Sequence, residues 1–198
     1  LLFLFINYLN FILNRKKSVE EERGIDYTWQ HKKHETTMNK FLPYAKQSIN
    51  DDDRNAVNET LQSDYLTRGP KTQAFEEAVA AYCGARYAVS FNSGSSALLA
   101  ACHAAQLKPF DRLITTPNTF VATVASALHF GVDPLFVDID RKTGNMDLNE
   151  VELNIHFESS RGRNIYMPVH FAGIPVDIER LNSMITDPEA LIIEDAAH

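Results

Sequence analysis

Hydrophobic and polar residues follow two alternating patterns over most of this chain. Short apolar runs typical of buried strands alternate with segments in which apolar residues recur every three or four positions, as on one face of a helix. Helices are predicted to begin near residues 50, 72, 97, 119, 147 and 175, and Asn50 and Thr119 are the expected N-caps of two of them. The predicted strands are residues 88–91, 112–116, 135–137, 164–169 and 190–194. Repeated strand–helix units with short connections predict the α/β class, a mostly parallel sheet with helices on both faces.

Polar clusters follow the predicted strands at the positions where each strand ends. The carboxyl ends of parallel strands meet at one edge of a sheet, and ligands bind there in folds of this class. The sequence therefore predicts one binding site assembled from several distant segments. The clusters are residues 92–96, 117–120, 170–173 and 194–198.

The first cluster has the composition of a phosphate-binding turn. Gly94 permits close approach of the backbone, Ser95 and Ser96 add hydroxyl donors, and the following helix offers free N–H groups and a positive dipole end. An ordinary helix start with serine as N-cap explains the same residues equally well, so both interpretations stay open here. The chain has no G-x-G-x-x-G and no G-x-x-x-x-G-K-[ST] motif, and it has no helical histidine pair with zinc spacing, so we expect no metal.

The other clusters hold candidate residues that each have two interpretations. Asp195 is either a helix N-cap or a fixed anion facing a heterocyclic nitrogen, whose protonated form it would stabilise. Phe120 either packs in the core or presents its ring to a flat ligand. His170 and His198 are each more commonly structural than catalytic, and Tyr65 and Thr67 lie in a polar loop that is most simply solvent-facing.

Composition and charge exclude some classes of protein. A net charge of −7 over 198 residues argues against nucleic-acid binding. Two cysteines, Cys83 and Cys102, form no disulfide framework and indicate a reducing, cytoplasmic setting. The apolar stretch at residues 1–13 is too short to span a bilayer, so no membrane association is expected. Periodic patterning improves only after Met38, so we expect residues 1–37 to be an appendage or mistranslated upstream sequence, and the domain to cover residues 38–198.

Six motifs in this order and spacing resemble the DegT/StrS-type aminotransferases, which use pyridoxal 5′-phosphate (PLP) to aminate keto-sugars carried on nucleotides. The resemblance extends from about Phe41 to His198. The residues of several motifs are most similar to those of the pseudaminic-acid branch, whose enzymes make UDP-4-amino-4,6-dideoxy-N-acetyl-β-L-altrosamine. The motifs are Leu66-Thr67-Arg68-Gly69-Pro70, Asn92-Ser93-Gly94-Ser95-Ser96-Ala97-Leu98, Pro117-Asn118-Thr119-Phe120-Val121-Ala122, Phe136-Val137-Asp138-Ile139-Asp140, Pro168-Val169-His170-Phe171-Ala172-Gly173 and Ile193-Glu194-Asp195-Ala196-Ala197-His198.

The resemblance implies a role for each candidate residue. Gly94, Ser95 and Ser96 match the cofactor phosphate cup, and Phe120 matches the ring that stacks on the pyridine. Asp195 matches the acid that pairs with the pyridine nitrogen, and His198 matches a position beside the phenolic oxygen. The expected substrate-side residues are Tyr65, Thr67 and His170.

The same resemblance implies the type I aminotransferase fold, a homodimer, and transfer of an amino group from glutamate to a keto-sugar nucleotide. It places the family's Schiff-base lysine and small domain beyond His198. The chain is therefore expected to be the amino-terminal portion of an incomplete large domain, inactive alone. Two alternatives stay open: an inactive gene fragment, and a non-catalytic module that binds nucleotide sugars.

Overall fold

The computed structural model describes residue 43, residues 46–154 and residues 162–198. The chain divides into two compact units, Leu1–Ser90 and Phe91–His198, and each is described by itself. The expected appendage at residues 1–37 lies outside the described residues, as does the end of the helix predicted to begin near residue 147.

The described residues of the first unit form two helices with well-defined ends. Helix α2 covers Asp51–Gln62 and helix α3 covers Pro70–Cys83. The Asn50 side chain accepts hydrogen bonds from the N–H groups of Asp52 and Asp53, and the Asp53 carboxylate accepts one from the Asn50 N–H at 2.8 Å. This reciprocal capping confirms Asn50 as the predicted N-cap.

The loop between these helices requires a glycine. A Cβ atom on Gly69 would lie 2.5 Å from the Cβ of Tyr65, which is closer than two carbon atoms can approach. The close approach explains the glycine in the Leu66–Pro70 motif. It also places Pro70 at the first helical position, where a missing N–H costs nothing.

The strand predicted at residues 88–91 is wrong. Among the described residues these four form no ladder with any strand, and a strand requires such pairing. The N–H and hydroxyl of Ser90 instead donate to the Glu76 carboxylate of α3, at 2.8 and 2.7 Å. The backbone hydrogen bond from Ser90 lowers the pKa of Glu76, with a further contribution from the hydroxyl.

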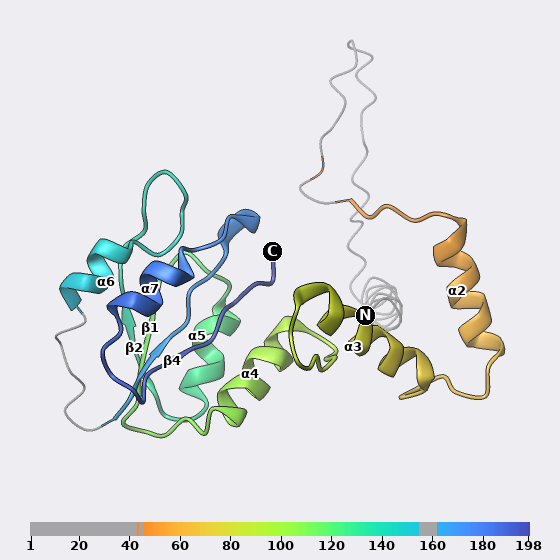
Figure 1. Ribbon diagram of the computed structural model, residues 1–198, viewed down its shortest axis with the longest axis horizontal. Coiled ribbons are helices and arrows are strands. Elements are labelled where there is room, and N and C mark those ends of the chain that lie inside the picture. Colours follow the sequence, from red (N-terminus) through yellow and green to blue (C-terminus); the bar gives the residue numbers. More distant parts are fainter. Residues whose placement is uncertain (1–42, 44–45, 155–161) are drawn as a thin grey trace, which may run out of the picture. The chain divides into compact units, whose positions relative to one another are not determined.

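The second unit is built on a parallel sheet (Figure 1). Its described strands, in the spatial order β2-β1-β3-β4, pair in parallel throughout. Each is shorter than or slightly displaced from its prediction, and single backbone hydrogen bonds continue beyond the named strands, as from the Asp195 N–H to the Pro168 carbonyl. The strands are β1 Arg112–Thr115, β2 Asp133–Phe136, β3 Asn164–Tyr166 and β4 Leu191–Ile192.

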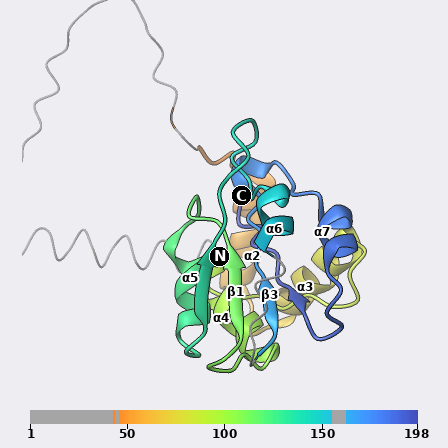
Figure 2. The ribbon, with the colours of Figure 1, turned by 90° about the vertical axis from the view of Figure 1, so that its left-hand side faces the viewer.

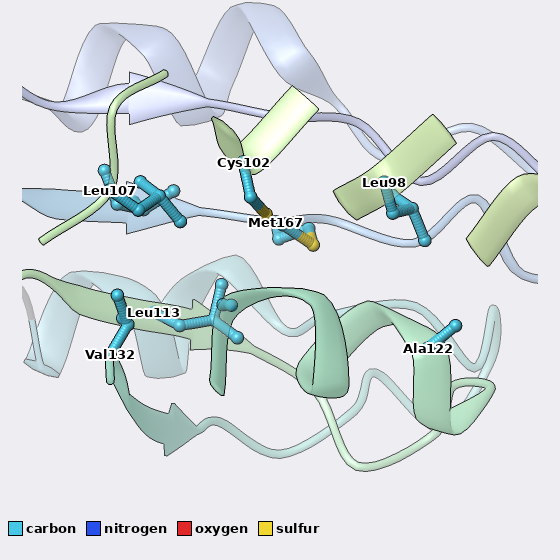
Figure 3. Packing of buried hydrophobic residues seen from close by; sticks show 9 residues of the cluster. Leu98, Cys102, Leu107, Leu113, Ala122, Val132 and Met167 are labelled. Carbon is cyan, nitrogen blue, oxygen red and sulfur yellow. The ribbon is translucent and has the colours of Figure 1, made fainter. Parts of the chain in front are cut away.

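Helices cover both faces of this sheet (Figure 2). Leu113 of β1 and Ile165 of β3 pack with the first pair of helices, α4 and α5, in the cluster shown in Figure 3. Ile114 and Tyr166, one residue further along the same strands, pack with the second pair, α6 and α7. Alternation of side chains along a strand produces the two cores, so the predicted fold class is confirmed. The helices are α4 Gly94–Ala104, α5 Val121–Leu128, α6 Leu148–Asn154 and α7 Ile178–Met184.

Four predicted helix starts differ from the structure. Helix α3 begins at Pro70 rather than near residue 72, because proline is favourable at the first helical position. Helix α4 begins at Gly94 rather than near residue 97, because the Ser93 side chain accepts from the Ser96 N–H and caps it there. Helix α5 begins after Phe120, because the hydroxyl of Thr119 contacts Thr123 rather than capping a backbone N–H. Helix α7 begins at Ile178, since the side chain of Asp177 accepts from the N–H of Arg180 and caps it there.

A partly buried ion pair joins the amino ends of β1 and β3, at the edge opposite the polar clusters. The guanidinium of Arg163 donates to the Asp111 carboxylate at 2.8 Å, and the Arg163 N–H donates to it at 3.0 Å. Burial opposes ionisation of Asp111, but the hydrogen bonds from Arg163 and Lys108 outweigh it and lower its pKa. The pair therefore holds these two chain segments together as charged groups. No helix within residues 46–154 or 162–198 is long and apolar enough to cross a membrane.

Candidate cofactor site

Three polar clusters of the second unit converge on one pocket at the carboxyl ends of the strands. The pocket has a volume of about 130 Å³. Segments at positions 117–120, 169–171 and 195–198 form its walls, as expected for the crevice of a parallel sheet. It is lined by Asn118, Thr119, Phe120, Val169, Phe171, Asp195, Ala197 and His198.

Asp195 is the buried charged group of this pocket, with only 6% of its surface exposed. Its backbone continues the sheet: the N–H donates to Pro168 at 2.9 Å and the carbonyl accepts from the His170 N–H at 3.0 Å. Its carboxylate accepts from the hydroxyl of Thr123 at 2.6 Å and from the N–H of Ala197 at 3.3 Å. A carboxylate has about four acceptor positions, so it retains capacity toward the pocket that it lines.

The ring of Phe120 lies at the pocket and not in the core. Phe120 is 72% exposed and is the N-cap residue of α5. The alternative interpretation, that Phe120 packs in the core, is therefore wrong within the second unit. An exposed aromatic ring beside a buried carboxylate can cover one face of a flat heterocycle.

The start of α4 lies next to the last segment of the pocket. A Cβ atom built on Gly94 would be 4.0 Å from the Cβ of Ala197. Ser93 is the N-cap, and its hydroxyl oxygen accepts from the Ser96 N–H at 3.2 Å. Gly94 and Ser95 are exposed in the first turn, where N–H groups have no partner within the helix. Serine thus caps the helix, as one of the two interpretations predicts. Phosphate binding by Gly94, Ser95 and Ser96 stays a prediction.

His198 is fixed by a backbone group and lines the pocket. Its Nδ1 accepts from the N–H of Ala172 at 3.0 Å, and its ring meets that of Phe171 edge to face. Because Nδ1 is an acceptor here, the neutral ring carries its proton on Nε2. Nε2 is then the atom of His198 that can donate to a ligand.

His170 uses both ring nitrogens inside the protein. Its Nδ1 accepts from the N–H of Val176 at 3.1 Å, which leaves Nε2 as the donor to Glu194 at 2.9 Å. These bonds hold the turn after β3 against the segment after β4. The expected substrate contact of His170 stays a prediction, and its geometry here is that of a positioning residue.

Several residues at this edge of the sheet form contacts that the sequence does not indicate. Asn118 donates to the carbonyl of Gly144 at 2.9 Å, and Asn145 bridges the N–H of Phe171 and the carbonyl of Ile174, at 2.9 and 2.8 Å. These bonds tie the hairpin-like loop before α6 to two walls of the pocket. Thr123, which binds the Asp195 carboxylate, carried one detectable signal: it lies four residues after Thr119, the spacing at which side chains are neighbours on a helix.

The remaining candidates, Tyr65 and Thr67, belong to the first unit. They lie in the loop between α2 and α3, as the sequence predicts, and both are exposed. Their expected place on the substrate side stays a prediction.

The residues present fit PLP. The cofactor needs an anion for its ring nitrogen, a surface for its ring and donors for its phosphate. Asp195 is a buried carboxylate with acceptor capacity left, Phe120 is an exposed ring at the same pocket, and α4 begins beside Ala197. None of the eight lining residues is a lysine.

Fold and pocket together define an α/β protein with a candidate ligand site at the carboxyl edge of a parallel sheet, and comparison with known proteins assigns the family. Residues 47–198 match the DegT/DnrJ/EryC1/StrS aminotransferase family, to which this chain belongs. The Bacillus subtilis spore coat polysaccharide biosynthesis protein SpsC is 38% identical over 160 residues, which cover 81% of this chain and 40% of SpsC. The chain thus spans about 40% of the length of the curated relatives it matches.

Solved structures of the family have the same fold. The PMP form of Spr1654 from Streptococcus pneumoniae aligns with a TM-score of 0.71 and 27% identity, covering 79% of this chain and 42% of that one. PseC from Helicobacter pylori, an aminotransferase involved in pseudaminic acid biosynthesis, aligns with a TM-score of 0.67 and 29% identity, covering 79% of this chain and 41% of PseC. Spr1654 is also known in a PLP form, which supports PLP as the cofactor of the family.

Proposed function

We propose that this chain supplies the cofactor-facing part of a PLP-dependent aminotransferase that transfers an amino group from glutamate to a keto-sugar nucleotide. The observation that carries the proposal is the buried carboxylate of Asp195, which lines the pocket between Phe120 and His198. The proposal concerns the whole protein and includes the homodimer implied by the family resemblance. It also includes a cytoplasmic setting, consistent with two free cysteines.

Each candidate residue has a task in this proposal. When bound, PLP supplies an electron-withdrawing ring that can hold an amino group between donor and acceptor. Asp195 keeps the ring nitrogen protonated, because opposite charges at close range favour each other's ionised forms. Phe120 covers one face of the ring and excludes water from it.

The ends of the cofactor are held by other groups. The N–H groups of Gly94 and Ser95 and the hydroxyls of Ser95 and Ser96 hold the phosphate at the start of α4. The Nε2 proton of His198 is available to an oxygen on the ring, since Ala172 occupies Nδ1.

The proposal also names the acceptor sugar. The Pro117–Phe120 motif and the His170–Gly173 motif support a substrate of the pseudaminic-acid branch, and the similarity to PseC is consistent with it. We accordingly propose a UDP-linked 4-keto sugar as acceptor, with Tyr65, Thr67 and His170 on the substrate side.

The proposal is tested with full-length protein. PLP binding is followed by absorbance, and the protein is then incubated with glutamate and a UDP-linked 4-keto-6-deoxy sugar. Formation of the amino sugar and of 2-oxoglutarate is measured by mass spectrometry. We expect Asp195→Ala to lower turnover by about a hundredfold or more while most PLP binding is retained, because electrostatic groups aimed at the reacting system have effects of this size.

Glu179→Gln is the matched control, because Glu179 is an exposed carboxylate on α7 of the same unit. It should leave turnover within twofold of the wild type. An Asp195→Ala protein with near-normal turnover would overturn the role of Asp195. Wild-type protein that binds the UDP-sugar without PLP would instead support a non-catalytic sugar-binding module, and wild-type protein that binds neither would support an inactive product.

A further inference from the structure

A chain of two threonine hydroxyls links Thr119, which lines the pocket, to the carboxylate of Asp195. The Thr119 and Thr123 hydroxyl oxygens are 2.6 Å apart, and the Thr123 hydroxyl is 2.6 Å from the Asp195 carboxylate. Thr119 lines the pocket, whereas Thr123, a residue of α5, is fully buried. The contact joins residues 72 positions apart in the sequence.

The direction of donation along this chain is determined by the carboxylate. An ionised carboxylate only accepts hydrogen bonds, so the single proton of Thr123 goes to Asp195. Thr119 must then donate to Thr123. The O–H···O distance of 2.6 Å is in the range of charge-assisted bonds, which are roughly twice as strong as neutral ones.

The alternative use of a helical threonine is to bond a carbonyl of its own helix. Thr123 turns its hydroxyl to Asp195 instead, and its own carbonyl accepts from the hydroxyl of Ser126 at 3.1 Å. The second contact of the carboxylate, from the Ala197 N–H at 3.3 Å, is long and holds it less firmly. Thr123 is therefore the group that orients the plane of the carboxylate.

From this geometry we infer that Thr123 is a positioning residue, which through the chain Thr119→Thr123→Asp195 holds the Asp195 carboxylate in the orientation that receives the ring nitrogen of the cofactor. The inference rests on the proposed function. It assigns to a residue that does not line the pocket a measurable effect on how the cofactor is bound.

The test compares three variants of the full-length protein. Thr123→Val removes the hydroxyl at almost constant volume, and Thr123→Ser retains it. Thr115→Val is the matched control, since Thr115 is a fully buried threonine of the same unit whose hydroxyl donates to the carbonyl of Met167 at 2.8 Å, away from the carboxylate. The readouts are the dissociation constant for PLP and the 15N shift of the ring nitrogen in labelled PLP, which reports its protonation.

We expect Thr123→Val to weaken PLP binding five- to thirtyfold and to move the 15N signal toward the unprotonated position. Thr123→Ser should restore both to within about twofold of the wild type, and Thr115→Val should change neither.

Equal binding and an unshifted signal in Thr123→Val would overturn the inference while leaving the proposed function intact. Equal losses in Thr123→Val and Thr115→Val would reduce Thr123 to a structural contact and overturn it as well. If Thr123→Val fails to fold, Thr119→Val, which removes the outer donor, must shift the signal in the same direction or the inference is overturned. Wild-type protein that binds no PLP would overturn the proposed function and this inference together.

Discussion

Ala172 donates its backbone N–H to the Nδ1 atom of His198 at 3.0 Å, and this bond connects the turn after β3 with the segment after β4. Ala172 has a positive φ of 54°, which is unfavourable for a residue with a Cβ atom. The imidazole therefore supports a strained turn through Nδ1 and keeps Nε2 as its other hydrogen-bonding atom.

We predict that His198→Ala frees this turn. The amide of Ala172 should exchange with deuterium faster, and the protein should lose about 1 kcal/mol of stability, because one hydrogen bond is lost and its donor is left to solvent. His198→Asn is the control, since its amide oxygen can accept in place of Nδ1. Hydrogen exchange followed by mass spectrometry checks both. Equal exchange rates in wild type and His198→Ala would show that the bond does not hold the turn.

We predict that the Asp111–Arg163 pair contributes to the free energy of unfolding in a pH-dependent way. The folded state lowers the pKa of Asp111, so the pair contributes fully above the unfolded pKa near 4. The contribution is lost as the pH falls below 4 through the lower folded value. Asp111→Asn should therefore cost about 3 kcal/mol at pH 7, because it leaves a largely buried guanidinium without its charge partner.

Urea denaturation of wild type and Asp111→Asn at pH 7, 5, 4 and 3 tests this sign. The difference in unfolding free energy should be constant from pH 7 to 5 and should shrink below pH 4. Glu152→Gln serves as control, because Glu152 and Arg180 form an exposed pair 3.7 Å apart that should contribute less than about 1 kcal/mol. A difference that grows toward low pH would contradict the assignment.

Substitutions of Gly94 and Ser93 distinguish the two interpretations of the turn before α4, a phosphate-binding turn and a simple helix cap. Gly94→Ala should change stability by less than about 0.5 kcal/mol, since the new Cβ would be 4.0 Å from Ala197, an ordinary contact. It should weaken PLP binding about tenfold if the phosphate approaches this backbone closely. Ser93→Ala should instead cost about 1 kcal/mol of stability through loss of the N-cap. Thermal melts and PLP titrations measure the two effects, and unchanged PLP binding in Gly94→Ala would leave this turn as a helix cap alone.

Local features of this chain were predictable from sequence because they depend on neighbouring residues. The capping box at Asn50 uses groups three positions apart, and the two faces of β1 follow from the alternation of Leu113 and Ile114. The pocket of Phe120, Asp195 and His198 was predictable in outline, because polar residues after parallel strands meet at one edge. Six motifs in register were enough to identify the family, which the match over residues 47–198 confirms.

Other features were decided by contacts between segments far apart in the chain. Residues 88–91 have the composition of a strand, yet Ser90 bonds to Glu76 and none of the described strands pairs with them. The meeting of Thr123 with Asp195 depends on where α5 lies against β4, and it spans 72 residues. Sequence periodicity indicates which side of a strand or helix is buried. It does not say which element covers that side, because this depends on the pairing order β2-β1-β3-β4 and on the packing of the helices against it.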